Sequence, residues 1–202
     1  MTIAELKAQI MGKQMKPLYI FTGNEIAVRD IYIKQIAKVG GYDIKWLEDA
    51  ADIVQAGRKR SIMQKKTLYI LSECNELVKN EKAQKILEMN FGSNMLLVLF
   101  TALDKRVKFY KQYKDIIVEF ETLQPEILKK YIQKEIDLSD KNCQNSMEVC
   151  ENDYGRCLLE IDKIMRYTNY LGPAKMENGV FEKLLKDGTI YKPPKDAIFD
   201  FV

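Results

Sequence analysis

Short apolar runs alternate with helix-period segments through the first 120 residues of this 202-residue chain. Runs of β-branched, aromatic and leucine residues between turn residues predict strands. Five such runs occur, at Pro17–Phe21, Tyr42–Leu47, Thr67–Leu71, Met95–Phe100 and Ile116–Phe120. Apolar residues at helical spacing predict four intervening helices, which begin near residues 26, 49, 80 and 104. This alternation is typical of an α/β fold with a parallel sheet.

The pattern changes at Pro125, a residue type favoured in the first turn of a helix. No strand-like run follows it, and apolar residues then recur at helical spacing within residues 127–136, 147–149, 158–165 and 180–185. Ser139 is the expected N-cap of the second of these helices. We therefore expect an α/β domain over residues 1–124, a small helical domain over residues 125–190, and a linker over residues 191–202.

Composition and charge limit the classes of partner. Hydrophobic residues make up 47% of the chain, which is enough for a buried core. No apolar run approaches the roughly 20 residues that cross a bilayer, so we expect a cytoplasmic protein without a membrane partner. Lys and Arg outnumber Asp and Glu by 20 to 15 in residues 1–124, and are outnumbered by 12 to 14 afterwards. Any contact with nucleic acid must therefore come from local basic patches.

The chain has no histidine, which excludes serine-histidine and cysteine-histidine hydrolases and removes the commonest zinc ligand. No Cys-x-x-Cys pair occurs among Cys74, Cys143, Cys150 and Cys157. We interpret all four as buried structural thiols in a reducing compartment, with no metal site. The last three recur every seven residues, but Asn152–Gly155 predicts a turn that would interrupt a common helix.

The strand, turn and helix over residues 17–38 stand where a phosphate-binding loop would lie. The turn contains Gly23 but lacks the second glycine, the lysine and the hydroxyl residue of such a loop, and Glu25 places a negative charge near the phosphates. We interpret it as a plain turn in which Gly23 takes a positive φ. Ser72 and Glu73 follow a central strand where an ATPase would offer Asp to magnesium and Glu to water. The sequence thus predicts a degenerate P-loop NTPase-like scaffold with no catalytic residue and no cofactor.

Two basic clusters are candidate contacts for DNA phosphates. One comprises Arg58, Lys59, Arg60, Lys65 and Lys66, and the other comprises Lys105, Arg106, Lys108 and Lys111. Both clusters are equally compatible with solvated helix faces. The spacing of Tyr110 and Tyr113 beside the second cluster favours packing against the sheet over base stacking.

The order and spacing of five segments resemble the delta subunit of the bacterial DNA polymerase III clamp loader. They are LYIFTGNE at 18–25, SIMQKKTLYILSE at 61–73, MLLVLFTALDKRVKFYK at 95–111, VEFETLQPEILKKYI at 118–132 and NDYGRCLLEIDKIMRY at 152–167. The more specific pieces are Leu-Asp-Lys-Arg-x-x-x-Tyr-Lys at 103–111 and Gly-Arg-x-x-x-x-Glu-x-x-Lys at 155–163.

The resemblance implies an AAA+-like sheet domain, a small helical lid-like domain and a collar domain, of which residues 191–202 would be the linker and the start. It also implies a subunit that does not bind ATP but binds and opens the sliding clamp (the beta subunit), together with the other loader subunits and primer-template DNA. The family's apolar clamp-binding pair falls on Ile62 and Met63. Arg156 stands where an active AAA+ protein has a phosphate-sensing arginine, and we expect it to pair with a carboxylate between the domains.

Other interpretations stay open at this point. Ile62 and Met63 could instead pack down as the end of a core helix. The rival function is a basic nucleic-acid-binding module on a degenerate NTPase scaffold, and a third is a degenerate NTPase that still binds nucleotide.

Overall fold

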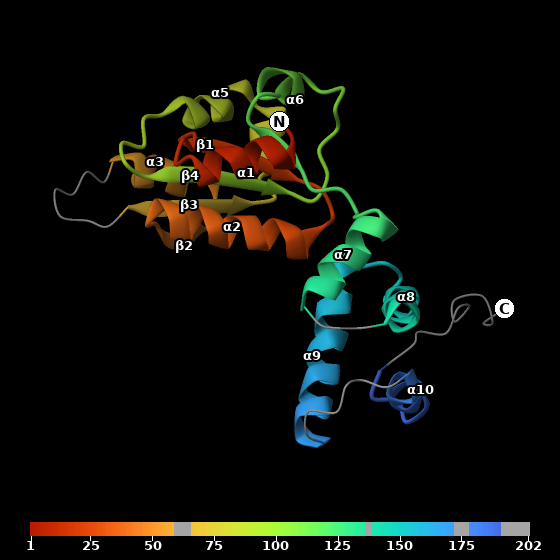
Figure 1. Ribbon diagram of the computed structural model, residues 1–202. Coiled ribbons are helices and arrows are strands. Elements are labelled where there is room, and N and C mark those ends of the chain that lie inside the picture. Colours follow the sequence, from red (N-terminus) through yellow and green to blue (C-terminus); the bar gives the residue numbers. More distant parts are fainter. Residues whose placement is uncertain (59–65, 136–138, 172–177, 191–202) are drawn as a thin grey trace. The chain divides into compact units, whose positions relative to one another are not determined.

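The structure is a computed structural model, and it describes residues 1–58, 66–135, 139–171 and 178–190 (Figure 1). The chain forms two compact units, Met1–Glu121 and Thr122–Val202, and each is described by itself. In the described residues, no helix combines the length and the apolar character needed to cross a lipid bilayer.

The first unit is built on a five-stranded parallel sheet in the order β2-β3-β4-β1-β5. The strands are β1 (Leu18–Thr22), β2 (Asp43–Leu47), β3 (Thr67–Ser72), β4 (Met95–Phe100) and β5 (Ile117–Glu119). Each of them lies within two residues of a predicted strand, so the α/β prediction is confirmed. β4 is buried along its whole length, because it is central in the sheet and both of its faces are covered.

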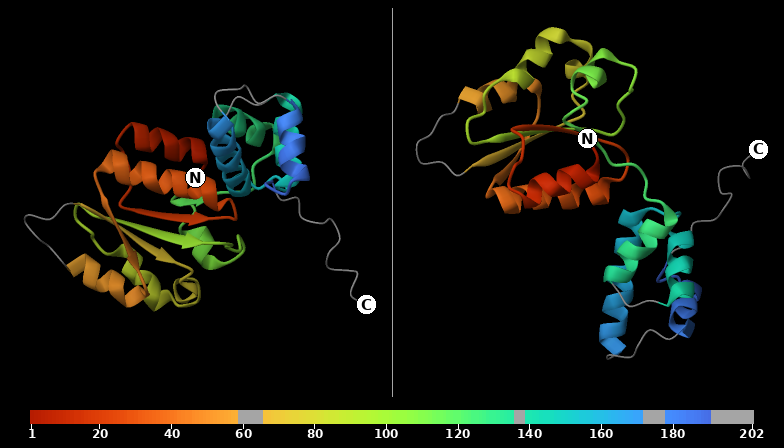
Figure 2. Two further views of the ribbon diagram at one scale, coloured as in Figure 1. Left: turned by 90° about the horizontal axis from the view of Figure 1, so that it is seen from below. Right: turned by 45° about the horizontal axis from the view of Figure 1, so that its top comes forward.

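Helices cover both faces of this sheet (Figure 2). α1 (Ile3–Met11) and α2 (Ile26–Gly40) lie over one face, and α3 (Ala50–Arg58), α4 (Asn75–Lys79), α5 (Glu81–Gln84) and α6 (Lys108–Gln112) over the other. Under the second set, Ile53 and Phe109 from the helices pack with Ile20, Leu71 and Val98 from the strands. The sheet unit therefore has the three-layer arrangement that its alternating sequence predicts.

Two helices of this unit are missing from the sequence prediction. α1 buries only Leu6 and Ile10, so its apolar pattern is weak. Its local signal is a capping box, in which the Thr2 hydroxyl accepts from the Glu5 N–H and the Glu5 carboxylate accepts from the Thr2 N–H. The other is α4, which precedes the segment predicted as one helix over residues 80–89.

The predicted helix over residues 80–89 is confirmed in part, because the segment is helical from Glu81 to Glu88 but changes from α-helix to 3₁₀ helix at Lys85. Asn80 has an extended backbone, ends α4, and caps α5 by accepting a hydrogen bond from the Lys82 N–H at 2.9 Å. From Lys85 the chain continues as a 3₁₀ helix, Lys85–Glu88.

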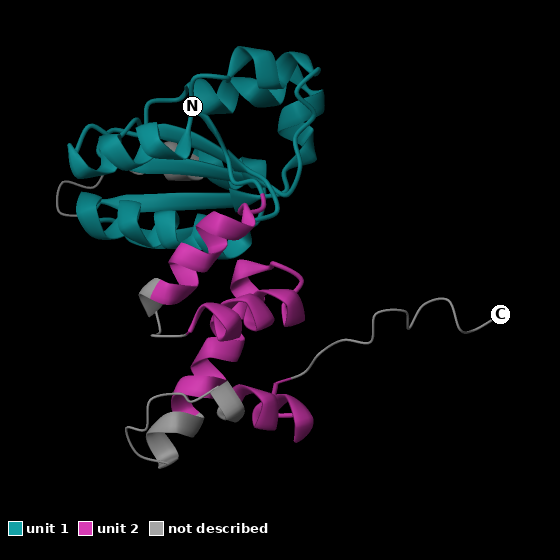
Figure 3. Ribbon diagram, turned by 45° about the vertical axis from the view of Figure 1, so that its right-hand side comes forward, with its two compact units in different colours: residues 1–121 teal, residues 122–202 magenta. Residues whose placement is uncertain are grey.

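The second unit is helical in its described residues (Figure 3). It contains α7 (Pro125–Glu135), α8 (Asp140–Val149), α9 (Tyr154–Leu171) and α10 (Asn178–Lys186). Ser139 caps α8, because its hydroxyl accepts from the Asn142 N–H at 3.3 Å, as the sequence predicts. The predicted turn at Asn152–Gly155 is displaced, since Glu151 and Asn152 take the left-handed conformation and Tyr154 already begins α9.

The cysteines of the helical unit lie in its core. Cys143, Cys150 and Cys157 are buried, which confirms the prediction for them, whereas Cys74 is only partly buried against the sheet core. Burial raises the pKa of the Cys143 thiol. A hydrogen bond with Cys150, together with burial, raises the pKa of Cys157. Cys143 and Cys157 therefore act as packing residues of the helical core.

Candidate functional site at the carboxyl edge of the sheet

The loop between β1 and α2 is folded against the ends of the neighbouring strands. Gly23 has a φ of 118°, which confirms the predicted positive φ. Its N–H donates to the Thr101 carbonyl at 3.2 Å, and the Glu25 N–H donates to the Phe120 carbonyl at 3.1 Å. A phosphate-binding loop needs backbone N–H groups that point at the ligand. Here two of those groups already bind carbonyls of the protein itself.

Glu25 adds a negative charge at the same place. It immediately precedes α2, and only 6% of its surface is exposed. The positive end of a helix dipole stabilises a carboxylate there, as it would stabilise a phosphate. A buried carboxylate at this position repels an incoming anion, so the helix N-terminus offers a poor phosphate site.

Thr101, which follows β4, connects this loop to Glu73 at the end of β3. The Glu73 carboxylate accepts from the Thr101 N–H at 2.6 Å and from the Thr101 hydroxyl at 2.7 Å. Glu73 has a φ of 54°, and its own N–H donates to the Leu99 carbonyl at 2.8 Å. The carboxylate that would activate water in an ATPase is thus used here to hydrogen-bond the end of β3 to the end of β4. The neighbouring Ser72 is exposed.

The predicted residues of the degenerate nucleotide site therefore divide between the two units. Gly23 and Glu73 are joined through Thr101, a residue that no sequence motif selects. Its only signal is its position after a central strand, where side chains gather at the carboxyl edge of a parallel sheet.

Arg156, on α9, belongs to the helical unit. Its Nη1 lies 2.7 Å from the Glu151 carboxylate, and its Nη2 donates to the Val149 carbonyl at 3.5 Å. The expectation of a carboxylate between the domains is wrong, because Glu151 lies in the same unit, in the turn before α9. The left-handed backbone at Glu151 reverses the chain and brings this side chain back to the first turn of the helix.

Carboxylates accompany the basic cluster around α6. Lys105 lies 2.7 Å from Glu119, Arg106 lies 2.8 Å from Asp104, and Lys108 lies 2.6 Å from Glu81. The Arg106 side chain holds the pKa of Asp104 down to about 2. The acidic neighbours of these three cations lower the net positive charge that the cluster presents to a phosphate.

Tyr110 and Tyr113 pack against the sheet core, which confirms the predicted packing role. The Tyr110 hydroxyl also donates to Glu119 at 2.6 Å. Burial alone raises the pKa of Glu119, but the hydrogen bonds from Lys105 and Tyr110 outweigh it and leave that pKa below its ordinary value.

The candidate clamp-binding pair, Ile62 and Met63, lies outside the described residues, as do Lys59, Arg60 and Lys65. Of Arg58, the last residue of α3, only the backbone is described. Lys66 is exposed, and its Nζ lies 5.9 Å from the centroid of the Tyr42 ring, within the range of a cation–π contact. The roles of these residues stay predictions.

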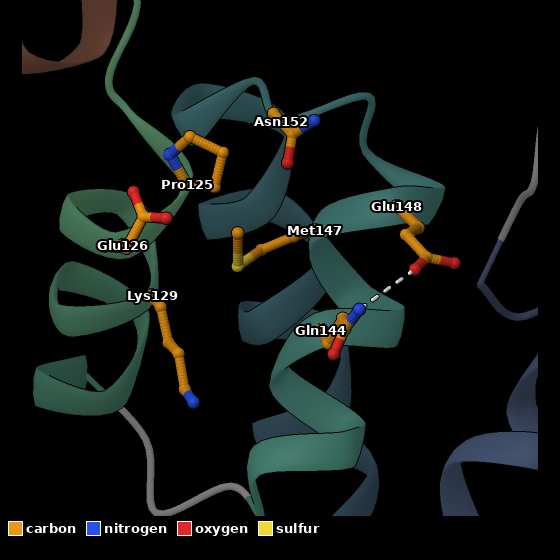
Figure 4. A pocket seen from close by; sticks show the side chains of 7 residues that line it. All are labelled: Pro125, Glu126, Lys129, Gln144, Met147, Glu148 and Asn152. Carbon is orange, nitrogen blue, oxygen red and sulfur yellow. Dashed lines mark hydrogen bonds between the residues drawn. The ribbon is translucent and has the colours of Figure 1, made fainter.

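The helical unit contains a cavity of about 320 Å³ between α7, α8 and the turn before α9 (Figure 4). It is lined by Pro125, Glu126, Lys129, Gln144, Met147, Glu148 and Asn152. Lys129 lies 2.9 Å from Asp140, so its charge is already balanced. In the described residues, no group of three or more acidic or cysteine side chains is placed to hold a metal ion.

No family model and no curated protein matches the chain. Solved structures similar to it include the Bacillus subtilis DNA clamp loader delta protein, at 12% identity and a TM-score of 0.58 over 90% of this chain. The Thermotoga maritima RuvB Holliday junction branch migration motor has 11% identity and a TM-score of 0.59 over 93% of this chain and 67% of its own. Domain III of the T. maritima replication initiation protein DnaA has 11% identity and a TM-score of 0.56 over 95% of this chain and 91% of its own.

At identities this low, the structural similarity shows the fold alone, which is an α/β fold shared with these AAA+ domains. The chain spans 61% of the length of the clamp loader delta protein.

Proposed function

We propose that the chain is a non-catalytic, delta-like clamp-loader subunit that binds the DNA sliding clamp and opens it during replication. Its fold is shared with a clamp loader delta protein and with other AAA+ proteins of DNA replication and recombination. The observation that carries the proposal is the closed loop after β1, in which the N–H groups of Gly23 and Glu25 donate to backbone carbonyls. An AAA+ scaffold closed in this way fits a binding subunit better than a motor.

Nucleotide binding at this loop would have to break both of those hydrogen bonds. The bonds to the Thr101 and Phe120 carbonyls would be lost, at about 0.5–1.5 kcal/mol each. At about 1.4 kcal/mol per tenfold change in affinity, these two losses alone weaken binding by roughly 5-fold to 140-fold. The Glu25 carboxylate repels the phosphates in addition.

We therefore expect no binding and no hydrolysis of ATP. Calorimetric titration of the full chain with ATP and magnesium should give no heat beyond dilution. Micromolar affinity that depends on magnesium would contradict this part of the proposal and favour a degenerate NTPase that still binds nucleotide.

The proposed clamp contact is the apolar pair Ile62 and Met63. Two apolar side chains that leave water for a pocket on the clamp contribute roughly 1.5–3 kcal/mol each. The basic residues around the pair would accelerate association with an acidic clamp surface, and their effect would fade with salt. They are Arg58, Lys59, Arg60, Lys65 and Lys66. The other proposed partners are the remaining loader subunits and primer-template DNA, and no cofactor is required.

The decisive experiment measures binding of the full chain to the sliding clamp of its own organism. The double variant Ile62→Ala with Met63→Ala should bind the clamp with an affinity that is lower by at least about a hundredfold, and its melting temperature should be unchanged. A control of the same composition is Ile127→Ala with Met165→Ala, which truncates two exposed side chains of the helical unit and should keep the affinity.

Three results would overturn the proposal or its contact. Absence of clamp binding by the unaltered chain removes the function. An unchanged affinity in the Ile62 and Met63 variant removes the contact. A collapsed melting temperature places the pair in the core. Salt-dependent DNA affinity without clamp binding would favour the nucleic-acid-binding module, although the pairing of Lys105 and Arg106 with carboxylates disfavours it.

A further inference from the structure

The outer edge of β2 presents backbone groups that pair with no strand of the described residues. β2 is the first strand in the sheet order, and its Asp43 N–H donates to the Lys66 carbonyl at 2.8 Å. Backbone groups alternate sides along a strand, so those of Asp43, Lys45 and Leu47 point at β3. Those of Ile44 and Trp46 point away from the sheet. Within the described parts of the chain, no strand lies on that side.

The same edge exposes two large apolar side chains. The exposed fraction is 43% for Ile44 and 58% for Trp46, the one tryptophan of the chain. Alternate residues of a strand share one face, so the two side chains lie together. Open backbone groups beside exposed apolar side chains are a template for pairing with another strand.

We propose that β2 pairs antiparallel with β2 of a second copy of this chain, with Ile44 opposite Ile44 across a twofold axis. The outward backbone groups belong to residues 44 and 46, so only registers that set these positions opposite even-numbered residues can form hydrogen bonds. Three such registers lie near the centre of the strand. They set Ile44 opposite Ile44, Ile44 opposite Trp46, or Trp46 opposite Trp46 of the second copy.

The charged side chains of β2 favour one of these registers over the others. With Ile44 opposite Trp46, the two Lys45 side chains would face each other in a non-hydrogen-bonded pair, where the Cα atoms are only about 4.5 Å apart. Like charges in that position destabilise the pairing. With Trp46 opposite Trp46, each Lys45 would face the uncharged Leu47. With Ile44 opposite Ile44, each Lys45 faces Asp43 of the other copy. Each Trp46 N–H then faces the carbonyl of Tyr42, whose own N–H already donates to the Ala37 carbonyl. The charges of the strand therefore favour Ile44 opposite Ile44.

The contact is small. A pair of five-residue strands with two apolar side chains each buries less than the roughly 1,200 Å² of a stable interface. We therefore expect a weak, concentration-dependent dimer. This inference is independent of the proposed function, because it concerns the edge of β2 and not the clamp.

The test is analytical ultracentrifugation of the full chain from about 10 µM to about 500 µM, because a small interface is expected to be weak. The unaltered chain should shift from monomer toward dimer. The emission of Trp46 should move to shorter wavelength, and the amides of Ile44 and Trp46 should become protected from deuterium exchange as concentration rises.

Charge variants test the register. Lys45→Asp should weaken self-association at least about tenfold, because it sets a new carboxylate opposite Asp43 of the other copy, twice in the dimer. The double variant Asp43→Lys with Lys45→Asp should restore it. Lys7→Asp makes the same charge change at an exposed position on α1, which contacts β5 at the opposite edge of the sheet, and it should have no effect.

A chain that stays monomeric at about 500 µM would overturn the proposal. So would self-association without protection of the two amides, an unaffected Lys45→Asp variant, or failure of the double charge exchange to restore association. Thermal melting of each variant checks that its fold is intact.

Discussion

Gly23→Ala tests whether the loop after β1 is closed against β5. A Cβ at Gly23 would lie 2.1 Å from the Phe120 carbonyl oxygen, so this backbone or the loop must move. The φ of 118° is also a conformation that an L-residue rarely adopts. In an open phosphate-binding loop, an added methyl group would instead meet solvent.

The expected loss of stability has two parts. The backbone conformation costs about 1–2 kcal/mol for a residue with a side chain. Displacing the loop also breaks the bonds from Gly23 to Thr101 and from Glu25 to Phe120, at about 0.5–1.5 kcal/mol each. The free energy of unfolding should therefore fall by about 2–5 kcal/mol.

Gly92→Ala provides the control. Gly92 also has a positive φ, of 63°, but a Cβ there meets no atom within 4 Å. It should lose only the conformational part, about 1–2 kcal/mol. Urea unfolding followed by circular dichroism compares the two variants. If Gly23→Ala is no less stable than Gly92→Ala, the loop is not held against β5 and the argument against a phosphate site fails.

Two further variants examine the side chains of the same unit. Thr101→Val removes the hydroxyl bond to Glu73 but keeps the N–H bond, so it should lower the free energy of unfolding by about 0.5–1.5 kcal/mol in the same assay, and an unchanged value would show that the hydroxyl bond is not formed. Glu119 has a pKa that is lowered in the folded state, so its contribution to stability is present above the unfolded value near 4.5 and is lost as pH falls through the folded value. The urea midpoint should accordingly fall below about pH 4.5 and fall less steeply in Glu119→Gln, whereas parallel curves would contradict the pairing of Glu119 with Lys105 and Tyr110.

The sequence predicts the sheet well and the small helices poorly, for a physical reason. Central strands such as β3 and β4 are buried on both faces, so their apolar runs are unmistakable. α1 buries only two side chains, and Asn80 separates the short helix α4 from α5 through a cap that hydrophobic periodicity does not report. At the site, the missing lysine and the charge of Glu25 are visible in the sequence.

The contacts of Thr101 and Arg156 are not visible there. Thr101 meets Gly23 and Glu73 only because the order of strands places β4 between β1 and β3. Arg156 has several carboxylates nearby in the sequence, and the left-handed turn at Glu151 decides which one it pairs with. Both contacts depend on backbone geometry that no single residue type specifies.

The hydrogen bonds of Thr101 to Gly23 and Glu73 also affect how the strand ends can respond to a nucleotide. In a nucleotide-driven protein, the ends of such strands respond to the presence or loss of a phosphate. Here Gly23, Thr101 and Glu73 are bonded to one another, so these strand ends are held together without a phosphate. In the clamp-loader role proposed above, such a unit would keep one arrangement through each round of ATP hydrolysis. The timing of clamp binding and release would then come from the ATPase subunits of the loader.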